Sequence, residues 1–148
     1  MGKITVETCE IEGLKVITPA VFGDARGYFM ETYNYNDYKE AGIDQIFVQD
    51  NQSAAKKGVL RGLHSAENKK QFFIPKNFAH GFLVLSDYAE FAYKCTDFYH
   101  PNDEGGIRYD DPDIGVKWPI PEGMELIMSE KDTKWDGLKE YNEFRRSL

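Results

Sequence analysis

The stretch Pro75-Lys76-Asn77-Phe78-Ala79-His80 is the part of the sequence that decides the fold. It lies between two short runs, residues 71–74 and 81–85, whose composition predicts β-strands. Pro75 interrupts the first run, and Asn77 enters left-handed backbone conformations more easily than other non-glycine residues. We therefore expect a turn between two strands here.

The rest of the chain repeats this pattern of short strands between turn signals. Further strands are expected at residues 14–18, 28–33, 46–50, 59–64 and 90–99, with a turn at 23–27 and a polar loop around Lys56-Lys57-Gly58. A short helix is expected at 34–41, closed by Gly42, and a longer one from Ser129 to about Arg146. The pattern predicts one mainly β domain over residues 1–148, a jelly roll or sandwich with a C-terminal helix.

Composition excludes several classes of protein. The 25 acidic side chains outnumber the 18 basic ones, and the net charge of -7 argues against a nucleic-acid surface. Two cysteines, Cys9 and Cys95, are too few for a disulfide framework and favour a reducing compartment. The N-terminus does not resemble a signal peptide, and no run of about eighteen apolar residues occurs. We expect a soluble, cytoplasmic protein with no membrane segment.

Strand alternation sorts the polar residues by face. In the run 90–99, Tyr93 and Tyr99 share one face, either as functional groups in a cavity or as two core tyrosines. Arg61 and His64 fall on opposite faces of an ideal strand, so Gly62 must mark a bulge or bend if both serve one site.

The histidines argue against a metal site. The sequence has only His64, His80 and His100, and no two of them have the close spacing of a pair of metal ligands. We therefore expect no metal. Taken alone, His80 is more typical of a buried, hydrogen-bonded histidine.

The opening stretch resembles the second motif of the cupin superfamily, a tight turn into a strand. In that motif a glycine occupies the position of Asn77. Asn77 tolerates the required backbone conformation, so the turn is expected to survive the substitution.

Seven sequence blocks extend over nearly the whole chain. They are Phe22-Gly23-Asp24-Ala25-Arg26-Gly27-Tyr28-Phe29-Met30-Glu31, Phe47-Val48-Gln49-Asp50-Asn51, Gly58-Val59-Leu60-Arg61-Gly62-Leu63-His64, Ser65-Ala66-Glu67-Asn68-Lys69-Lys70-Gln71, Ile74-Pro75-Lys76-Asn77-Phe78-Ala79-His80-Gly81-Phe82, Tyr93-Lys94-Cys95-Thr96-Asp97-Phe98-Tyr99 and Ser129-Glu130-Lys131-Asp132. In this order they resemble the dTDP-4-dehydrorhamnose 3,5-epimerase family. The resemblance implies a cupin-like jelly roll, a homodimer and an enzyme without metal or organic cofactor. It also implies inversion of carbons 3 and 5 of dTDP-4-dehydro-6-deoxyglucose, a dTDP-linked 4-keto-6-deoxy sugar, on the route to dTDP-L-rhamnose.

The same resemblance assigns residue roles. Removing a hydrogen next to a ketone requires a base, an acid on the opposite face and stabilisation of the enolate. By resemblance His64 is the base, Tyr93 is the acid, and Asp132 orients His64. The implied substrate contacts are Arg26, Glu31, Gln49, Asn51, Arg61, His80, Tyr99, Glu104 and Lys131. The guanidinium groups of Arg26 and Arg61 can donate paired hydrogen bonds to phosphate oxygens. The resemblance implies that Tyr99 stacks on thymine.

Two of these residues also have simpler interpretations. Asp132 completes a pattern typical of a capping box that opens the last helix. Asp24-Ala25-Arg26-Gly27 is also typical of a solvated turn with a local ion pair.

The chain departs from the family where His64 runs directly into Ser65. In the family a glutamine-and-lysine segment, several strands and a connection separate these two blocks, so the active-site lysine has no counterpart here. We hypothesise that the jelly roll is incomplete and pairs its open edges with a partner chain, or that strands are exchanged within a dimer. A shortened gene product is the other explanation. The functional alternatives are an active epimerase, a non-catalytic dTDP-sugar-binding relative or shortened inactive form, and an epimerase acting on carbon 3 alone.

Overall fold

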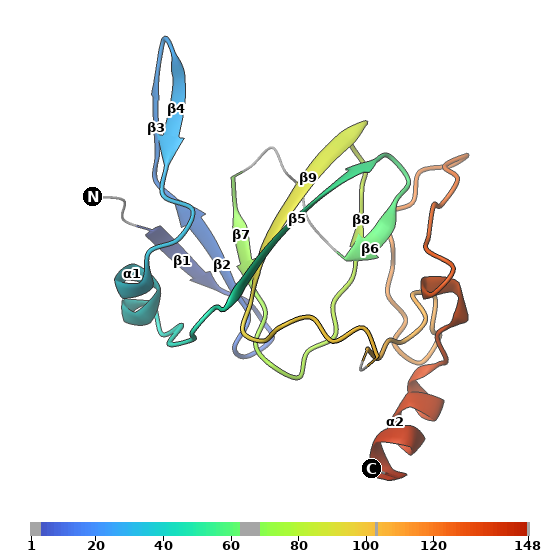
Figure 1. Ribbon diagram of the computed structural model, residues 1–148. Helices are drawn as coiled ribbons and strands as arrows, with labels where there is room; N and C mark the ends of the chain where they lie inside the picture. The colour runs from blue at the N-terminus through green and yellow to red at the C-terminus, as the bar shows by residue number, and fades with distance from the viewer. Residues whose placement is uncertain (1–3, 63–68, 103, 148) are drawn as a thin grey trace. The chain divides into compact units, whose positions relative to one another are not determined.

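The computed structural model describes residues 4–62, 69–102 and 104–147 (Figure 1). Nine strands, two α-helices and one 3-10 helix lie within these ranges, which confirms the prediction of a mainly β chain. The chain divides into two compact units. Unit 1 comprises the described residues of Met1–Asn51, Ser65–Phe78 and Tyr93–Asp97, and unit 2 comprises those of Gln52–His64, Ala79–Ala92 and Phe98–Leu148.

Unit 1 contains a three-stranded antiparallel sheet with the order β1-β2-β7. The strands are β1 (Ile4–Thr8), β2 (Lys15–Pro19) and β7 (Gln71–Phe73). The core of the unit is formed by Ile17, Tyr38 and Ile43, with partly buried apolar neighbours from β1, β7 and the loops. Sequence reasoning found β2 and β7 but did not predict β1.

Helix α1 (Tyr35–Glu40) begins and ends where its sequence signals indicate. The Asn34 side chain accepts hydrogen bonds from the backbone N–H groups of Asn36 and Asp37, which satisfies donors that the first turn leaves unpaired. Gly42 follows with a φ of 76°, the left-handed conformation typical of a helix C-terminus. The short helix predicted here is confirmed.

Strands β3 (Val21–Asp24) and β4 (Gly27–Met30) form an antiparallel hairpin in unit 1. Its turn falls within the predicted 23–27 stretch, and Gly27 has a φ of 135°, in the region that favours glycine. The strand ends at Met30 rather than at Tyr33, because Tyr33 turns to contact the rings of Tyr38 and Phe47 instead.

Unit 2 contains the antiparallel pair β6 (Leu60–Gly62) and β8 (Phe82–Leu83). Leu60 pairs with Leu83 while Gly62 pairs with Phe82, so the register shifts between Leu60 and Gly62. An extra residue on one strand is the signature of a β-bulge. The bend that alternation required at Gly62 is therefore confirmed.

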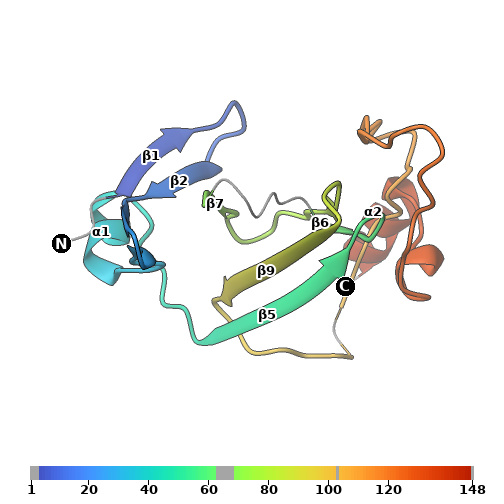
Figure 2. The same ribbon diagram turned by 90° about the horizontal axis from the view of Figure 1, so that it is seen from above.

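Strands β5 (Gln49–Lys56) and β9 (Tyr88–Cys95) pair with each other and lie side by side in both ribbon views (Figure 2). Two boundaries predicted here are wrong. β5 extends into the stretch predicted as a polar loop. Its residues alternate between half-buried and exposed, as in a strand, but the half-buried ones are polar or small, so the sequence lacked the apolar signal of a strand. β9 ends at Cys95, so Tyr99 lies beyond it.

The C-terminal helix is present but shorter than predicted. A 3-10 turn, η1, covers Asp132–Lys134, and α2 covers Leu138–Ser147. Trp135, Asp136 and Gly137 separate them, so the helix begins nine residues after Ser129. Neither α1 nor α2, the α-helices of the described chain, has the length and apolar composition of a membrane span.

The turn at the opening stretch is confirmed by backbone geometry. Asn77 has a φ of 69° and accepts the left-handed position without a glycine. In the described residues the strands form one three-stranded sheet and three pairs.

Candidate functional site

Unit 1 carries two amide side chains on one face of β5. Gln49 and Asn51 are two residues apart and both half-buried, and Gln49 Nε2 donates to Asn51 Oδ1 over 3.0 Å. Asn51 Nδ2 in turn contacts Cys95 Sγ of β9 at 3.5 Å. The intervening Asp50 is exposed and accepts from Lys94 at 2.8 Å. The predicted nucleotide contacts on β5 are thus brought together.

Glu31, which follows β4, has an unusual carboxylate. Its Oε2 atom is buried and accepts no hydrogen bond from the described residues. Burying a carboxylate oxygen without a donor is costly, so a ligand N–H or O–H at this position would offset the cost. The geometry suits a residue predicted to contact the nucleotide.

The two tyrosines predicted as acid and stacking residue are not core residues. Tyr93 on β9 is 42% exposed, and Tyr99 is 62% exposed. The core interpretation is therefore wrong, because β9 ends before Tyr99 and its alternation of burial is interrupted at Tyr93.

Arg26 lies at the tip of the β3–β4 hairpin, with its side chain 89% exposed. Its Nε donates to both carboxylate oxygens of Asp24 at 3.2 Å, and the Arg26 backbone N–H donates to Asp24 Oδ1 at 2.8 Å. These hydrogen bonds lower the pKa of Asp24 and raise the pKa of Arg26. The local ion pair is confirmed, and the phosphate role of Arg26 stays a prediction.

Unit 2 brings together two other predicted contacts, Glu104 and Lys131, as an ion pair. Lys131 Nζ also lies 5.7 Å from the centre of the Trp135 ring, within range of a cation–π contact. A hollow of about 430 Å³ is lined by Glu130, Lys131, Lys134 and Trp135. Sequence reasoning placed Trp135 on a helix and missed its place in this hollow, although its spacing four residues after Lys131 offered a signal.

Asp132 is hydrogen-bonded to Ser129. Ser129 Oγ donates to Asp132 Oδ2 at 2.7 Å and accepts the Asp132 N–H at 3.1 Å. The prediction of a capping box that opens the last helix is wrong. The residue before η1 is Lys131, which makes no side-chain cap hydrogen bond, and the last helix begins only at Leu138. The role of Asp132 toward His64 stays a prediction, because His64 lies outside the described residues.

Two more predicted site residues belong to unit 2. The Arg61 backbone forms the bulge of β6, while its side chain is outside the described part of the structure. His80 is exposed at the surface, yet desolvation by nearby protein atoms lowers its pKa below the usual 6.5. A lower pKa keeps the imidazole neutral near pH 7, in the form that accepts a hydrogen bond.

In the part of the chain that the structure describes, no group of three or more His, Cys, Asp or Glu residues has the geometry to hold a metal ion. Cys9 and Cys95 are both free thiols.

Known proteins resemble this chain over most of its length. The family model described as dTDP-4-dehydrorhamnose 3,5-epimerase matches residues 8–67 and 65–140. The dTDP-4-dehydrorhamnose 3,5-epimerase of Methanothermobacter thermautotrophicus is 41% identical over 170 residues, covering 88% of this chain and 92% of the relative. The enzyme of the same name from Escherichia coli is 39% identical over 173 residues, with the same coverage of both chains.

Solved structures give the same result for the fold. The dTDP-6-deoxy-D-glucose-3,5-epimerase of Legionella pneumophila, solved with dTDP-4-keto-L-rhamnose, is 38% identical with a TM-score of 0.85, covering 92% of this chain and 93% of its own. The dTDP-4-dehydrorhamnose 3,5-epimerase of Elizabethkingia anophelis is 36% identical with a TM-score of 0.82, covering 94% and 98%. The prediction of a cupin-like jelly roll is confirmed.

The family match is interrupted where the sequence departs from the family. The two matched segments meet at residues 65–67, next to the junction of His64 and Ser65. Because 88% of this chain is about 130 residues, about 40 of the 170 positions aligned with the Methanothermobacter enzyme have no residue from this chain. An interior segment of the family is thus missing here. With its other blocks matched over residues 8–140, the chain belongs to the dTDP-4-dehydrorhamnose 3,5-epimerase family.

Proposed function

We propose that this chain binds dTDP-4-dehydro-6-deoxyglucose and inverts its carbons 3 and 5 in dTDP-L-rhamnose biosynthesis, by removing and returning a proton next to the C4 ketone. Family membership supports the reaction class. The observation that carries the proposal is the bulge between Leu60 and Gly62. It is the backbone feature required if Arg61 and His64 serve one site.

The proton transfers are assigned to two side chains. His64 removes the proton, because an imidazole titrates near neutral pH. Tyr93 returns a proton from the opposite face, and its exposed position on β9 leaves it accessible to a ligand. Asp132 orients His64, although in the free protein it is held by Ser129.

Each unit carries its own set of predicted substrate contacts. In unit 1 the amides of Gln49 and Asn51 and the buried, unsatisfied oxygen of Glu31 offer donors and acceptors to the nucleotide. In unit 2 Lys131 and Glu104 contact the substrate. Arg26 and Arg61 bind the diphosphate, Tyr99 stacks on thymine, and His80 lies close to the sugar.

The missing segment lowers the rate. In the family it carries a lysine that stabilises negative charge, and removing one preorganised charge-stabilising group costs about two to three orders of magnitude in rate. We therefore propose an active but slow epimerase.

We also propose that the chain acts as a homodimer and as one domain in the cytoplasm. The proposal of a partner chain rests on the β3–β4 hairpin, where Phe22, Tyr28 and Phe29 are all exposed. Exposed apolar patches of this kind mark interaction sites. The proposal of one domain rests on β5 and β9, because each of these strands has residues in both units.

Deuterium incorporation tests the reaction. The protein is incubated with dTDP-4-dehydro-6-deoxyglucose in heavy water, and the proton signals at carbons 3 and 5 are followed by NMR. We expect both signals to disappear slowly, with no exchange in His64→Ala and unchanged exchange in the matched control His100→Ala. Exchange at carbon 3 alone identifies the 3-epimerase alternative. Binding of dTDP without any exchange identifies the non-catalytic relative and refutes the proposal.

A further inference from the structure

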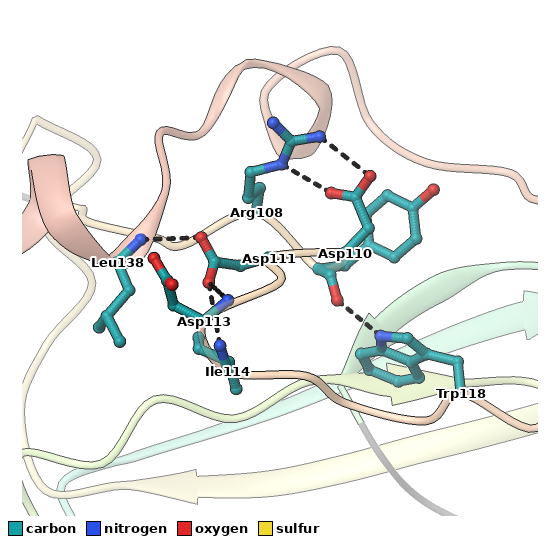
Figure 3. Close-up of polar contacts among 8 residues, drawn as sticks. Arg108, Asp110, Asp111, Asp113, Ile114, Trp118 and Leu138 are labelled. Carbon is teal, nitrogen blue, oxygen red and sulfur yellow. Dashed lines mark hydrogen bonds and ion pairs between the residues drawn. The ribbon is translucent and has the colours of Figure 1, made fainter.

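Asp111 is the buried charged residue of the described chain, with only 5% of its surface exposed. Its Oδ1 accepts the N–H groups of Asp113 and Ile114 at 2.8 and 3.0 Å, which closes a local turn. Its Oδ2 accepts the N–H of Leu138 at 3.0 Å (Figure 3). One carboxylate thus closes its own turn and caps the first residue of α2, 27 residues away in sequence.

Further contacts join the same two segments, residues 104–114 and residues 131–141. The Arg108 N–H donates to the Asp136 carbonyl at 3.0 Å. Gly106 lies close to the Trp135 indole, where an added Cβ would be 2.5 Å from a ring atom. The segments are therefore joined at several points along their length, all within unit 2.

The Trp135 ring thus has two neighbours, the backbone of Gly106 and the Lys131 Nζ atom. Lys131 pairs with Glu104, which begins the facing segment. The hollow lined by Glu130, Lys131, Lys134 and Trp135 therefore belongs to a segment that Asp111 ties, through Leu138, to residues 104–114. A lysine side chain loses much rotamer freedom when it binds a ligand, so contact with a fixed aromatic ring, which restricts the side chain beforehand, favours binding.

We propose that Asp111 is a positioning residue for nucleotide binding: by fixing Leu138 it holds Trp135, and through Trp135 it holds Lys131 where the anionic part of the sugar nucleotide binds. The inference rests on the proposed function. Asp111 itself contacts backbone N–H groups, those of Asp113, Ile114 and Leu138.

The carboxylate chemistry gives two independent variants. In Asp111→Asn one oxygen becomes an NH₂ donor, which would face either the Leu138 N–H or the two turn N–H groups, so one of these links is lost. In Gly137→Ala the new Cβ would lie 2.7 Å from Asp111 Oδ2 and would displace the carboxylate from Leu138. Asp110→Asn is the matched control, because Asp110 is the neighbouring carboxylate and pairs with Arg108 at the surface.

The experiment measures the dissociation constant of dTDP by calorimetry and the KM and kcat of the epimerisation, at a temperature where each variant is folded. We expect Asp111→Asn and Gly137→Ala to weaken dTDP binding and raise KM by about tenfold, with kcat within about twofold, while Asp110→Asn changes neither. If Asp111→Asn does not fold, Gly137→Ala decides the matter alone.

The outcomes separate this inference from the proposed function. Lack of dTDP binding by the unaltered chain refutes the proposed function itself. If the unaltered chain binds dTDP and both variants bind it equally well, with only a lower melting temperature, Asp111 supports the fold and the positioning role is overturned.

Discussion

The two compact units hold their predicted substrate contacts in different ways. Unit 1 places Gln49 and Asn51 on a strand and buries Ile17, Tyr38 and Ile43 in an apolar cluster. Unit 2 places Glu104 and Lys131 on irregular segments that are tied by Asp111 and by glycine–aromatic contacts. Apolar packing is non-directional, whereas a hydrogen-bonded loop depends on each partner. Unit 2 also buries Leu60, Phe82, Leu83 and Val84, so the contrast concerns the segments that carry the predicted contacts. Substitutions near those segments should act through side-chain volume in unit 1 and through backbone space and charge in unit 2.

The largest effect is expected from the core of unit 1. Ile17 is 1% exposed, and Ile17→Ala should lower the free energy of unfolding by about 2–5 kcal/mol, since it removes buried methyl groups and leaves a cavity. Chemical denaturation followed by far-UV circular dichroism measures this loss. Leu60→Ala is the counterpart in unit 2, where Leu60 is also buried. A loss below about 1 kcal/mol for Ile17→Ala would show that the cluster does not support the fold.

Two glycines of unit 2 distinguish the cost of a left-handed backbone conformation from the cost of a steric clash with a neighbouring segment. Gly58 and Gly123 have φ angles of 86° and 77°, but an added Cβ would be 2.4 Å from the Glu125 carbonyl oxygen at Gly58 and would meet nothing within 4 Å at Gly123. We expect Gly123→Ala to cost about 1–2 kcal/mol from the left-handed conformation alone. Gly58→Ala should cost more, because the Glu125 backbone must also move. Thermal denaturation ranks the two variants, and equal losses would contradict the role of the Glu125 contact.

Local signals in the sequence predicted much of the fold. Asn34 and Gly42 marked the ends of α1, Asn77 marked a left-handed turn, and Gly62 marked the bulge. Each of these features depends on backbone preferences of one or two residues, which the sequence displays directly. The family blocks supplied the site residues and the break after His64.

Features that depend on distant residues were not predictable in this way. The last helix begins at Leu138 because Asp111 caps it from 27 residues away, while the local pattern at Ser129 predicted an earlier start. β5 extends to Lys56 through pairing with β9, although its own residues are polar. The Glu104–Lys131 pair and the contact between Gly106 and Trp135 likewise arise only once the two segments meet.

Lys131 in unit 2 and Arg26 in unit 1 should respond differently when dTDP binding is tested by substitution. Lys131→Met removes a charge that is held over Trp135, and we expect dTDP binding to weaken by about tenfold. Lys131 also has an ion-pair partner, Glu104, but Arg26 is held by a more exposed carboxylate, Asp24, which it must leave to bind phosphate. Asp24→Asn should therefore strengthen dTDP binding, by about two- to fivefold at low salt. Isothermal titration of dTDP at two salt concentrations measures both. Weaker binding by Asp24→Asn would mean that the ion pair orients Arg26 for the ligand.

The smallest expected effect is a pH dependence of stability from His80 in unit 2. Desolvation lowers the pKa of His80 in the folded chain below its usual 6.5, so the unfolded chain takes up this proton first as the pH falls. The contribution of His80 to stability is therefore complete above about pH 6.5, is lost as the pH falls through the folded-state pKa, and is level below it. Unfolding in urea between pH 8 and pH 5 should show a smaller loss of stability in His80→Gln than in the unaltered chain, while His100→Gln keeps the full loss. An identical pH dependence in His80→Gln would mean that His80 is as well solvated in the folded chain as in the unfolded one.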